Sequence, residues 1–122
     1  MFEVSVSGIF SAAHYLRDYH GKCEKLHVHN WNVEVSIRSK VLDNSGMVVD
    51  FKELKYKLNK ALFEFDHSFI NEIPYFKKVN PTSENIAAYI YKKLKRLFPH
   101  KNLKVIKVSV WESEKTHATF LP

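Results

Sequence analysis

The sequence is poor in cysteine and glycine and has no long apolar run. It contains one cysteine and three glycines among 122 residues. Because the single cysteine, Cys23, cannot form a disulfide within the chain, a disulfide-stapled secreted fold is excluded and a reducing, cytoplasmic setting is expected. No apolar stretch approaches the roughly 20 residues of a membrane-spanning helix, and the N-terminus lacks a signal-peptide pattern. We therefore expect no membrane segment.

The remaining composition is that of a folded globular domain. Hydrophobic residues make up 45% of the chain and aromatic residues 14%, and this length suffices for one domain with its own core. There is no repeat, low-complexity segment or linker, so residues 1–122 are expected to form a single domain. Lysine and arginine exceed aspartate and glutamate by six, 19 against 13, which favours an anionic partner such as a phosphorylated metabolite or a nucleic acid.

Four stretches alternate apolar and polar residues, which is the pattern of half-buried β-strands. They span residues 1–8, 29–40, 104–112 and 118–121. In the third stretch, Ile106, Val108 and Val110 share one parity and are expected to face the core. Glu112 continues that parity at the end of the strand.

Two further stretches have the spacing of amphipathic helices. The first begins at Asp50, which has the character of an N-cap residue. The second begins at Thr82 or Ser83 and reaches about Phe98, before a proline. The residues expected to form the two buried stripes are Phe51, Leu54, Leu58, Leu62 and Phe65 in the first helix and Ile86, Ala87, Ile90, Leu94 and Leu97 in the second.

This order of elements predicts an α+β fold. Two strands, two helices and two strands give a four-stranded antiparallel sheet with both helices on one face. Four strands cannot close a barrel, and open sheet edges invite pairing with other chains. We therefore expect a homo-oligomer assembled through the edges of the sheet.

The strongest chemical signal is a pair of histidines, His27 and His29, at the start of the second strand. Side chains two residues apart on a strand share one face, so both imidazoles can bind one metal ion. A third ligand must come from elsewhere. Cys23 could complete a structural Cys/His site, but the chain has no Cys-x-x-Cys pair, so a catalytic metal with an open position is favoured.

Two other carboxylates stand out. Asp66 precedes His67, and a carboxylate can orient an imidazole and raise its basicity if the two side chains meet. Glu112 lies on the parity of three core residues at a strand end, where a carboxylate is either exposed past the core or buried with a partner. In the second case it would be a bidentate acceptor for a cationic or amide-like edge of a ligand.

Six motifs occur in order along the chain and together carry a resemblance to a known family. They are Phe10-Ser-Ala-Ala-His14, Cys23-x-x-x-His27-x-His29, Gly46-x-x-x-Asp50-Phe51, Asp66-His67-Ser68-x-x-Asn71, Pro81-Thr82-Ser83-Glu84 and the strand-end Glu112. The chain resembles the 6-pyruvoyl-tetrahydropterin synthase family, especially its 6-carboxy-tetrahydropterin synthase branch. The resemblance covers nearly the whole chain.

The resemblance implies a fold, a substrate and a metal. The family has the tunnelling fold, in which trimers form barrels that stack as hexamers, and 7,8-dihydroneopterin triphosphate binds at subunit interfaces. The zinc ligands would be His14, His27 and His29, with a fourth position left for the substrate. This set supplies the missing third ligand and agrees with the open site expected of catalytic zinc.

The resemblance also implies roles for the remaining residues. Cys23 would be the general base, and Asp66 with His67 would complete a proton relay acting on Cys23 of a neighbouring subunit. Glu112 would anchor the amino-pyrimidine edge of the pterin. Thr82 and Ser83 would contribute to the same pocket.

The implied reaction is that of a carbon–oxygen lyase forming 6-carboxy-tetrahydropterin, with loss of acetaldehyde and triphosphate, on the route to queuosine. Val28 departs from the family, since most members have glycine between the zinc histidines. Glu24 is ambiguous: Cys23 fits the Cys-x-x-x-His pattern of the carboxy-forming branch, whereas Glu24 fits the Glu-x-x-His pattern of a folate-related branch.

Three alternatives therefore stay open. The first is 6-pyruvoyl-tetrahydropterin synthesis, and the second is aldolase-like cleavage to 6-hydroxymethyl-dihydropterin through Glu24. The third is a basic nucleic-acid-binding module with a structural zinc. The third ranks well behind, because the basic residues alternate with buried helix positions and do not cluster around exposed aromatic residues.

Overall fold

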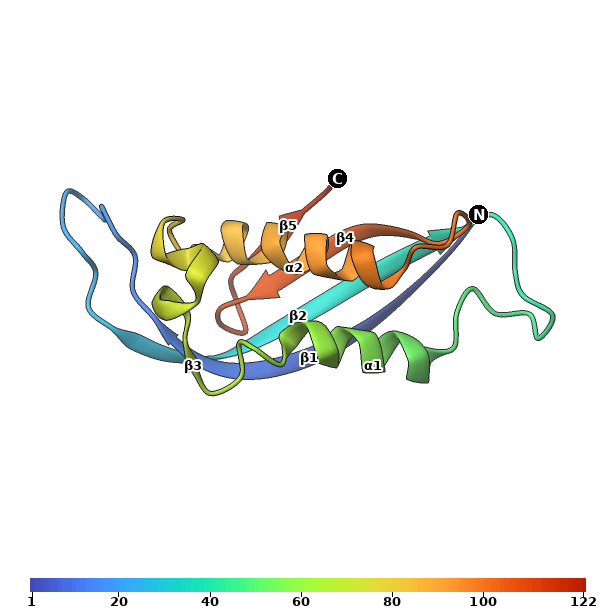
Figure 1. The fold of residues 1–122 in the computed structure, drawn as a ribbon, viewed down its shortest axis with the longest axis horizontal. Helices are drawn as coiled ribbons and strands as arrows, with labels where there is room; N and C mark the ends of the chain where they lie inside the picture. The colour runs from blue at the N-terminus through green and yellow to red at the C-terminus, as the bar shows by residue number, and fades with distance from the viewer.

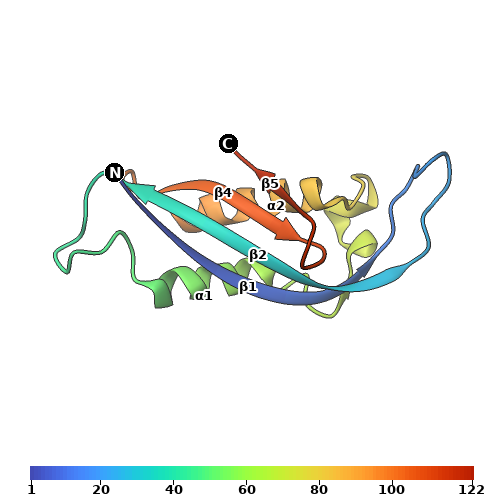
Figure 2. The same ribbon diagram turned by 180° about the vertical axis from the view of Figure 1, so that it is seen from behind.

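The computed structural model describes residues 1–122 as a sheet with two helices packed on one face (Figure 1). Seen from behind, the other face of the sheet carries no helix (Figure 2). The α+β class and the placement of both helices on one face are confirmed. No helix combines the length and the apolar character that crossing a membrane requires. The elements are β1 (Phe2–His14), β2 (His27–Ser39), α1 (Phe51–Leu62), β3 (Ser68–Phe69), the 3₁₀ turns η1 (Ile70–Glu72) and η2 (Pro74–Lys77), α2 (Ser83–Leu97), β4 (Lys104–Trp111) and β5 (His117–Phe120).

The expected four-stranded antiparallel sheet is wrong in one respect, because a fifth strand makes the sheet mixed. The strand order is β3-β1-β2-β4-β5. β3 pairs in parallel with β1, joining Ala12 to Ser68 and Ala13 to Phe69. A strand of two residues has no alternation to detect in the sequence. It forms because the chain after α1 returns past the end of β1, where the N–H of His67 donates to the carbonyl oxygen of Ser11 at 2.6 Å.

The first two strands are longer than predicted and form one hairpin of thirteen residues on each side. β1 extends beyond residues 1–8 to His14, and β2 begins at His27, two residues earlier than expected. Alternation continues through Phe10, Ala12 and His14, but the small residues between them lack strand character. The register joins His14 directly to His27. The hairpin therefore brings the histidine of one motif against those of another.

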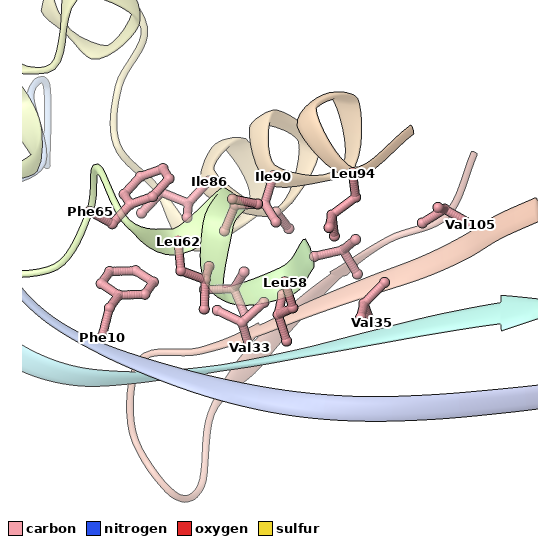
Figure 3. Close-up of a cluster of buried hydrophobic side chains, with 14 of the residues drawn as sticks. Phe10, Val33, Val35, Leu58, Leu62, Phe65, Ile86, Ile90, Leu94 and Val105 are labelled. Atoms are coloured by element: carbon pink, nitrogen blue, oxygen red, sulfur yellow. The ribbon is translucent and has the colours of Figure 1, made fainter. Parts of the chain in front are cut away.

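The core lies between the helices and the covered face of the sheet (Figure 3). Strand residues such as Val33 and Val35 meet helix residues such as Leu58, Ile86 and Ile90, all of them fully buried. Most of the predicted helix stripes are confirmed. Phe51 is an exception: it is the first residue of α1 and is 59% exposed. Phe65 is buried as expected but lies beyond the end of α1, and Leu97 is only partly buried.

The parity expected in β4 is wrong at one position. Val105, Val108 and Val110 are buried, whereas Ile106 is only half-buried. The pairing of β2 with β4 shifts between Ser36 and Ile37, so that one extra residue of β4 bulges from the ladder. A β-bulge reverses the alternation on its strand, which explains the change. Beyond the bulge the parity is the one predicted, so Val108 and Val110 face the core as expected.

Both helix starts are confirmed at the residues that the sequence indicates. The carboxylate of Asp50 accepts from the N–H of Lys52 at 2.8 Å, and the hydroxyl of Thr82 accepts from the N–H of Asn85 at 3.1 Å. Each bond satisfies an N–H group that the helix itself leaves without a partner. The caps fix where the helices begin, and the cap of α2 fixes the adjacent Pro81 close to His14.

A glycine allows α1 to approach β1 closely. A Cβ atom added at Gly8 would lie 3.1 Å from Cδ1 of Leu62 and 3.2 Å from Oδ1 of Asn59. We therefore expect Gly8→Val to lower the free energy of unfolding by about 1–3 kcal/mol, the usual cost of overpacking. Urea denaturation measures this. Ser7→Val, on the exposed face of the same strand, is the matched control; equal stabilities for the two variants would contradict the close packing of α1 on β1.

Candidate metal centre

Three histidines and one glutamate meet at one end of the sheet. His14 is the last residue of β1, His27 and His29 begin β2, and Glu112 directly follows β4. One ligand atom from each of the four residues lies within 4.8 Å of those from the others. The expectation that His27 and His29 share a face is confirmed by a distance of 4.4 Å between their ring centroids. The structure thus brings His14 to them as a third imidazole.

Backbone carbonyl groups fix the tautomers of two of these imidazoles. Nδ1 of His14 lies 2.9 Å from the carbonyl oxygen of Pro81, and Nδ1 of His27 lies 3.0 Å from that of Lys25. Because a carbonyl oxygen only accepts, each Nδ1 carries the proton and donates. Each neutral ring therefore directs the lone pair of Nε2 into the cluster. Such carbonyl partners are typical of histidines that bind metal ions.

The ligand atoms of the cluster face one another at short distances. Nε2 of His14 and Nε2 of His27 are 2.8 Å apart, so two lone pairs face each other. Nε2 of His29 lies 2.8 Å from Oε1 of Glu112, yet it is buried and makes no hydrogen bond of acceptable geometry. We read that short distance as two ligand atoms converging and not as a hydrogen bond. A cation bound among these atoms would satisfy all of them, and three imidazoles with a carboxylate suit zinc.

The floor of the site is buried and apolar. Trp31 is fully buried and packs edge-on against His14, with 4.7 Å between the ring centroids. The indole N–H of Trp31 donates to the carbonyl oxygen of Ala12 at 3.2 Å, which holds the ring in place. Burial lowers the pKa of His14. The imidazole is therefore kept neutral, which is the form that binds a metal.

Glu112 lies closer to the histidines than the sequence indicates. Its Oε1 atom is 3.5 Å from Nε2 of His14 and 3.4 Å from Nε2 of His27, in addition to its contact with His29. Parity placed this carboxylate on the core face of β4, but only the pairing of β4 with β2 brings it to the histidines. The anchoring of a pterin by Glu112 stays a prediction.

Asp66 and His67 form a pair next to β1. Nδ1 of His67 lies 3.1 Å from Oδ2 of Asp66, so the two side chains do meet. The N–H of Ser11 donates to Oδ1 of Asp66 at 3.0 Å and holds the pKa of that carboxyl below its usual value. The side chain of His67 is 84% exposed. Neither side chain forms a hydrogen bond or ion pair with the histidine cluster of the same chain.

The loop between β1 and β2 carries the two candidate bases. Cys23 is an exposed free thiol. Glu24 is held more firmly: its N–H donates to the carbonyl oxygen of Leu16 at 2.8 Å, and its Oε1 accepts from the N–H of Leu16 at 3.3 Å. The same carboxylate oxygen lies 3.5 Å from Nδ1 of His27. Val28 is exposed, as its parity predicts.

Two asparagines to which the sequence analysis assigned no role hold the chain beyond His14. The amide of Asn71 accepts from the N–H of Tyr15 and donates to its carbonyl oxygen, both at 3.0 Å. The amide of Asn80 does the same for Arg17, at 2.8 and 3.0 Å. These side chains bond alternate residues as a neighbouring strand would. Asn71 is the last residue of one of the family motifs, and Asn80 directly precedes another. Thr82 and Ser83 lie at the start of α2, and their part in a ligand pocket stays a prediction.

Comparison with known proteins decides the family. Residues 3–122 match the family described as 6-pyruvoyl tetrahydropterin synthase. The chain belongs to this family. Its tunnelling fold is thereby confirmed, and it is an enzyme of the pterin-synthase type.

Relatives within the 6-pyruvoyl tetrahydropterin synthase family carry two different product names. A protein of Archaeoglobus fulgidus, for which the name 6-carboxy-5,6,7,8-tetrahydropterin synthase has been proposed, is 43% identical over 111 residues, or 91% of this chain and 88% of that protein. The 6-carboxy-5,6,7,8-tetrahydropterin synthase of Rickettsia conorii is 30% identical and covers 85% of this chain and 88% of its own. The structure of the 6-pyruvoyl tetrahydropterin synthase of Caenorhabditis elegans matches with a TM-score of 0.85, 28% identity and coverage of 99% of this chain and 95% of the other.

The geometry predicts which substitutions abolish metal binding. His27→Ala removes a ligand, so zinc affinity should fall by more than about 100-fold, beyond the range seen when only an outer partner is lost. Cys23→Ala should retain the metal, because the thiol is not among the converging ligand atoms. Metal analysis of the purified variants measures both. A site emptied by Cys23→Ala would make Cys23 a ligand and favour a structural Cys/His site.

The two hydrogen bonds between Asn80 and the backbone of Arg17 give a second prediction. Asn80→Ala should raise the hydrogen-exchange rate of the Arg17 amide by about fivefold to tenfold, since a bond of roughly 1 kcal/mol is lost. Exchange followed by nuclear magnetic resonance measures this rate. Asn32→Ala is the matched control, because that exposed side chain makes no hydrogen bond and should leave the rate unchanged. Equal rates in both variants would show that Asn80 does not hold the loop.

Proposed function

We propose that the protein converts 7,8-dihydroneopterin triphosphate and water into 6-carboxy-5,6,7,8-tetrahydropterin, acetaldehyde and triphosphate, with zinc held by His14, His27 and His29. The convergence of the Nε2 atoms of three histidines on one partly buried position is the observation that carries the proposal. The names given to the relatives from Archaeoglobus fulgidus and Rickettsia conorii support this product. The reaction would belong to the queuosine route.

The residues around the site have separable tasks. Zinc, when bound, supplies Lewis-acid polarisation of the oxygens of the substrate side chain. The carbonyl groups of Pro81 and Lys25 hold two imidazoles in the tautomer that presents Nε2. Cys23 removes and returns protons at the side-chain carbons as its thiolate. Glu112 accepts hydrogen bonds from the amino-pyrimidine edge of the pterin, and Thr82 and Ser83 line the same pocket.

The proton relay requires a second subunit. The Asp66–His67 pair is exposed and forms no hydrogen bond or ion pair with the histidine cluster of its own chain, so we place it beside Cys23 of a neighbour. Both outer edges of the sheet support association: β1 has β3 beside it only at Ala12 and Ala13, and β5 is the last strand of the sheet. Unpaired strand edges are ready sites for pairing. We propose trimeric barrels that stack into a hexamer.

One observation favours a second candidate reaction. Glu24 places its carboxylate 3.5 Å from Nδ1 of His27, beside one of the candidate metal ligands. In that position it could act as the base for cleavage to 6-hydroxymethyl-dihydropterin, or for 6-pyruvoyl-tetrahydropterin synthesis. Against this, its bonds to Leu16 give it a structural task at the loop. We therefore rank the route through Cys23 first.

Product analysis with zinc-loaded protein and 7,8-dihydroneopterin triphosphate tests the proposal. We expect 6-carboxy-5,6,7,8-tetrahydropterin, acetaldehyde and triphosphate in equal amounts. Cys23→Ala should lower kcat by about 10²- to 10⁴-fold, the usual contribution of a general acid–base group. Glu24→Gln keeps an acceptor for the N–H of Leu16 and should leave the product unchanged.

Other products would contradict this assignment. Formation of 6-hydroxymethyl-dihydropterin, abolished by Glu24→Gln, would establish the aldolase-like reaction in place of the proposed one. Absence of turnover by the zinc-loaded oligomer would show that the protein acts on a different substrate. His27→Ala, which lacks a metal ligand, serves as the inactive control in each assay.

A further inference from the structure

A basic pocket lies at the end of the sheet opposite the metal centre. It has a volume of about 420 Å³ and is lined by Arg38, Lys40, Lys101 and Lys104, with Met1 and Ile106 as its apolar lining. The β-bulge between β2 and β4 lies at this end and brings Ile106 towards the outer face of the sheet. Bulges often re-aim side chains in this way near functional sites.

The basic pocket is too far from the metal centre to belong to it within one chain. β2 runs from His27 at the metal centre to Ser39 at the pocket, a difference of 12 positions. At roughly 3.3 Å per residue these sites are about 40 Å apart. Figures 1 and 2 show the N-terminus at one end of the long sheet and the loop between β1 and β2 at the other.

The charges in the basic pocket repel one another. Arg38 and Lys104 are direct partners across the β2–β4 ladder, and like charges in that position destabilise a sheet. Glu3 offsets only Arg38, with 2.9 Å between Oε1 and Nε. Lys40, Lys101 and Lys104 form no ion pair within 4.0 Å of a carboxylate. A bound anion would remove this repulsion.

We propose that the basic pocket binds the triphosphate chain of a small molecule. A pocket of this volume is within the range of sites for small ligands. Four cationic side chains around one hollow suit several adjacent phosphate groups, each with oxygens that accept charge-assisted hydrogen bonds. Inorganic triphosphate and nucleoside triphosphates share this chemistry.

A nucleic acid fits the basic pocket less well. A polynucleotide needs a continuous basic track and aromatic side chains on which bases stack. The pocket is lined by no aromatic residue. The positive surface is interrupted on the same face of the sheet by Glu3 and by Glu34, which lies 3.9 Å from Lys107. The observations therefore favour a compact polyanion.

Calorimetric titration of the full chain with inorganic triphosphate, at low salt, tests this proposal. In the double variant Lys101→Ala/Lys104→Ala the affinity should fall by about tenfold, as expected for two exposed charge contacts. The control Lys52→Ala/Lys55→Ala removes the same charge from exposed positions of α1 and should change affinity by less than about twofold. His27→Ala, in which the metal site is disabled, should bind triphosphate as the unaltered chain does.

Three results would overturn the proposal. Equal weakening in both lysine variants would mean that triphosphate responds only to net charge. Binding lost in His27→Ala but kept in Lys101→Ala/Lys104→Ala would place triphosphate at the metal centre. A single-stranded oligonucleotide that binds more tightly than triphosphate, and loses that affinity in the pocket variant, would identify a polynucleotide site.

A parallel titration with ATP distinguishes inorganic triphosphate from a nucleoside triphosphate as the preferred ligand. Equal affinities for ATP and inorganic triphosphate would show that the pocket recognises the phosphate chain alone, whereas tighter binding of ATP would add a contact to the nucleoside. Both results support the proposal. The pocket does not depend on the proposed pterin reaction, since its titration needs neither zinc nor turnover.

Discussion

The register of the β1–β2 hairpin is the constraint on which both the core and the metal centre depend. Trp31, Val33 and Val35 are buried under the helices, and His27 and His29 share their parity. A slip of one residue would turn all of them to the uncovered face of the sheet at once. The hydrophobic core therefore selects the register, and the register places two histidines in the site. The metal centre is therefore aligned by the apolar burial of the residues that follow it on the same strand.

A second set of contacts comes from the segment between the two helices. Pro81 holds the imidazole of His14, while Asn71 and Asn80 hold the two alternate residues that follow it. All three act through hydrogen bonds with defined direction, so they fix orientation as well as position. The N-cap of α2 stands next to Pro81. The start of a helix, a metal ligand and the entry to the Cys23 loop are in this way positioned by one short stretch of chain.

Local patterns in the sequence predicted most of the fold, whereas the fifth strand and the changed parity in β4 have non-local causes. Alternation located the main strands, and Asp50 and Thr82 were found as caps because each bonds an N–H within three residues. β3 has only two residues and forms because the chain returns beside β1, which no local pattern indicates. The bulge at Ile106 depends on the pairing of β4 with β2. The same holds for the site. The spacing of His27 and His29 gave their common face, whereas the approach of His14 and Glu112 required the register of three strands.

Glu112 links the metal and the proposed substrate. Its Oε1 atom lies within 3.5 Å of all three histidine Nε2 atoms, so the carboxylate could join the imidazoles in holding a metal ion. Under the proposed function, the same carboxylate would accept hydrogen bonds from the amino-pyrimidine N–H groups of the pterin. One residue at the end of β4 would in this way serve both the metal centre and the recognition of the substrate.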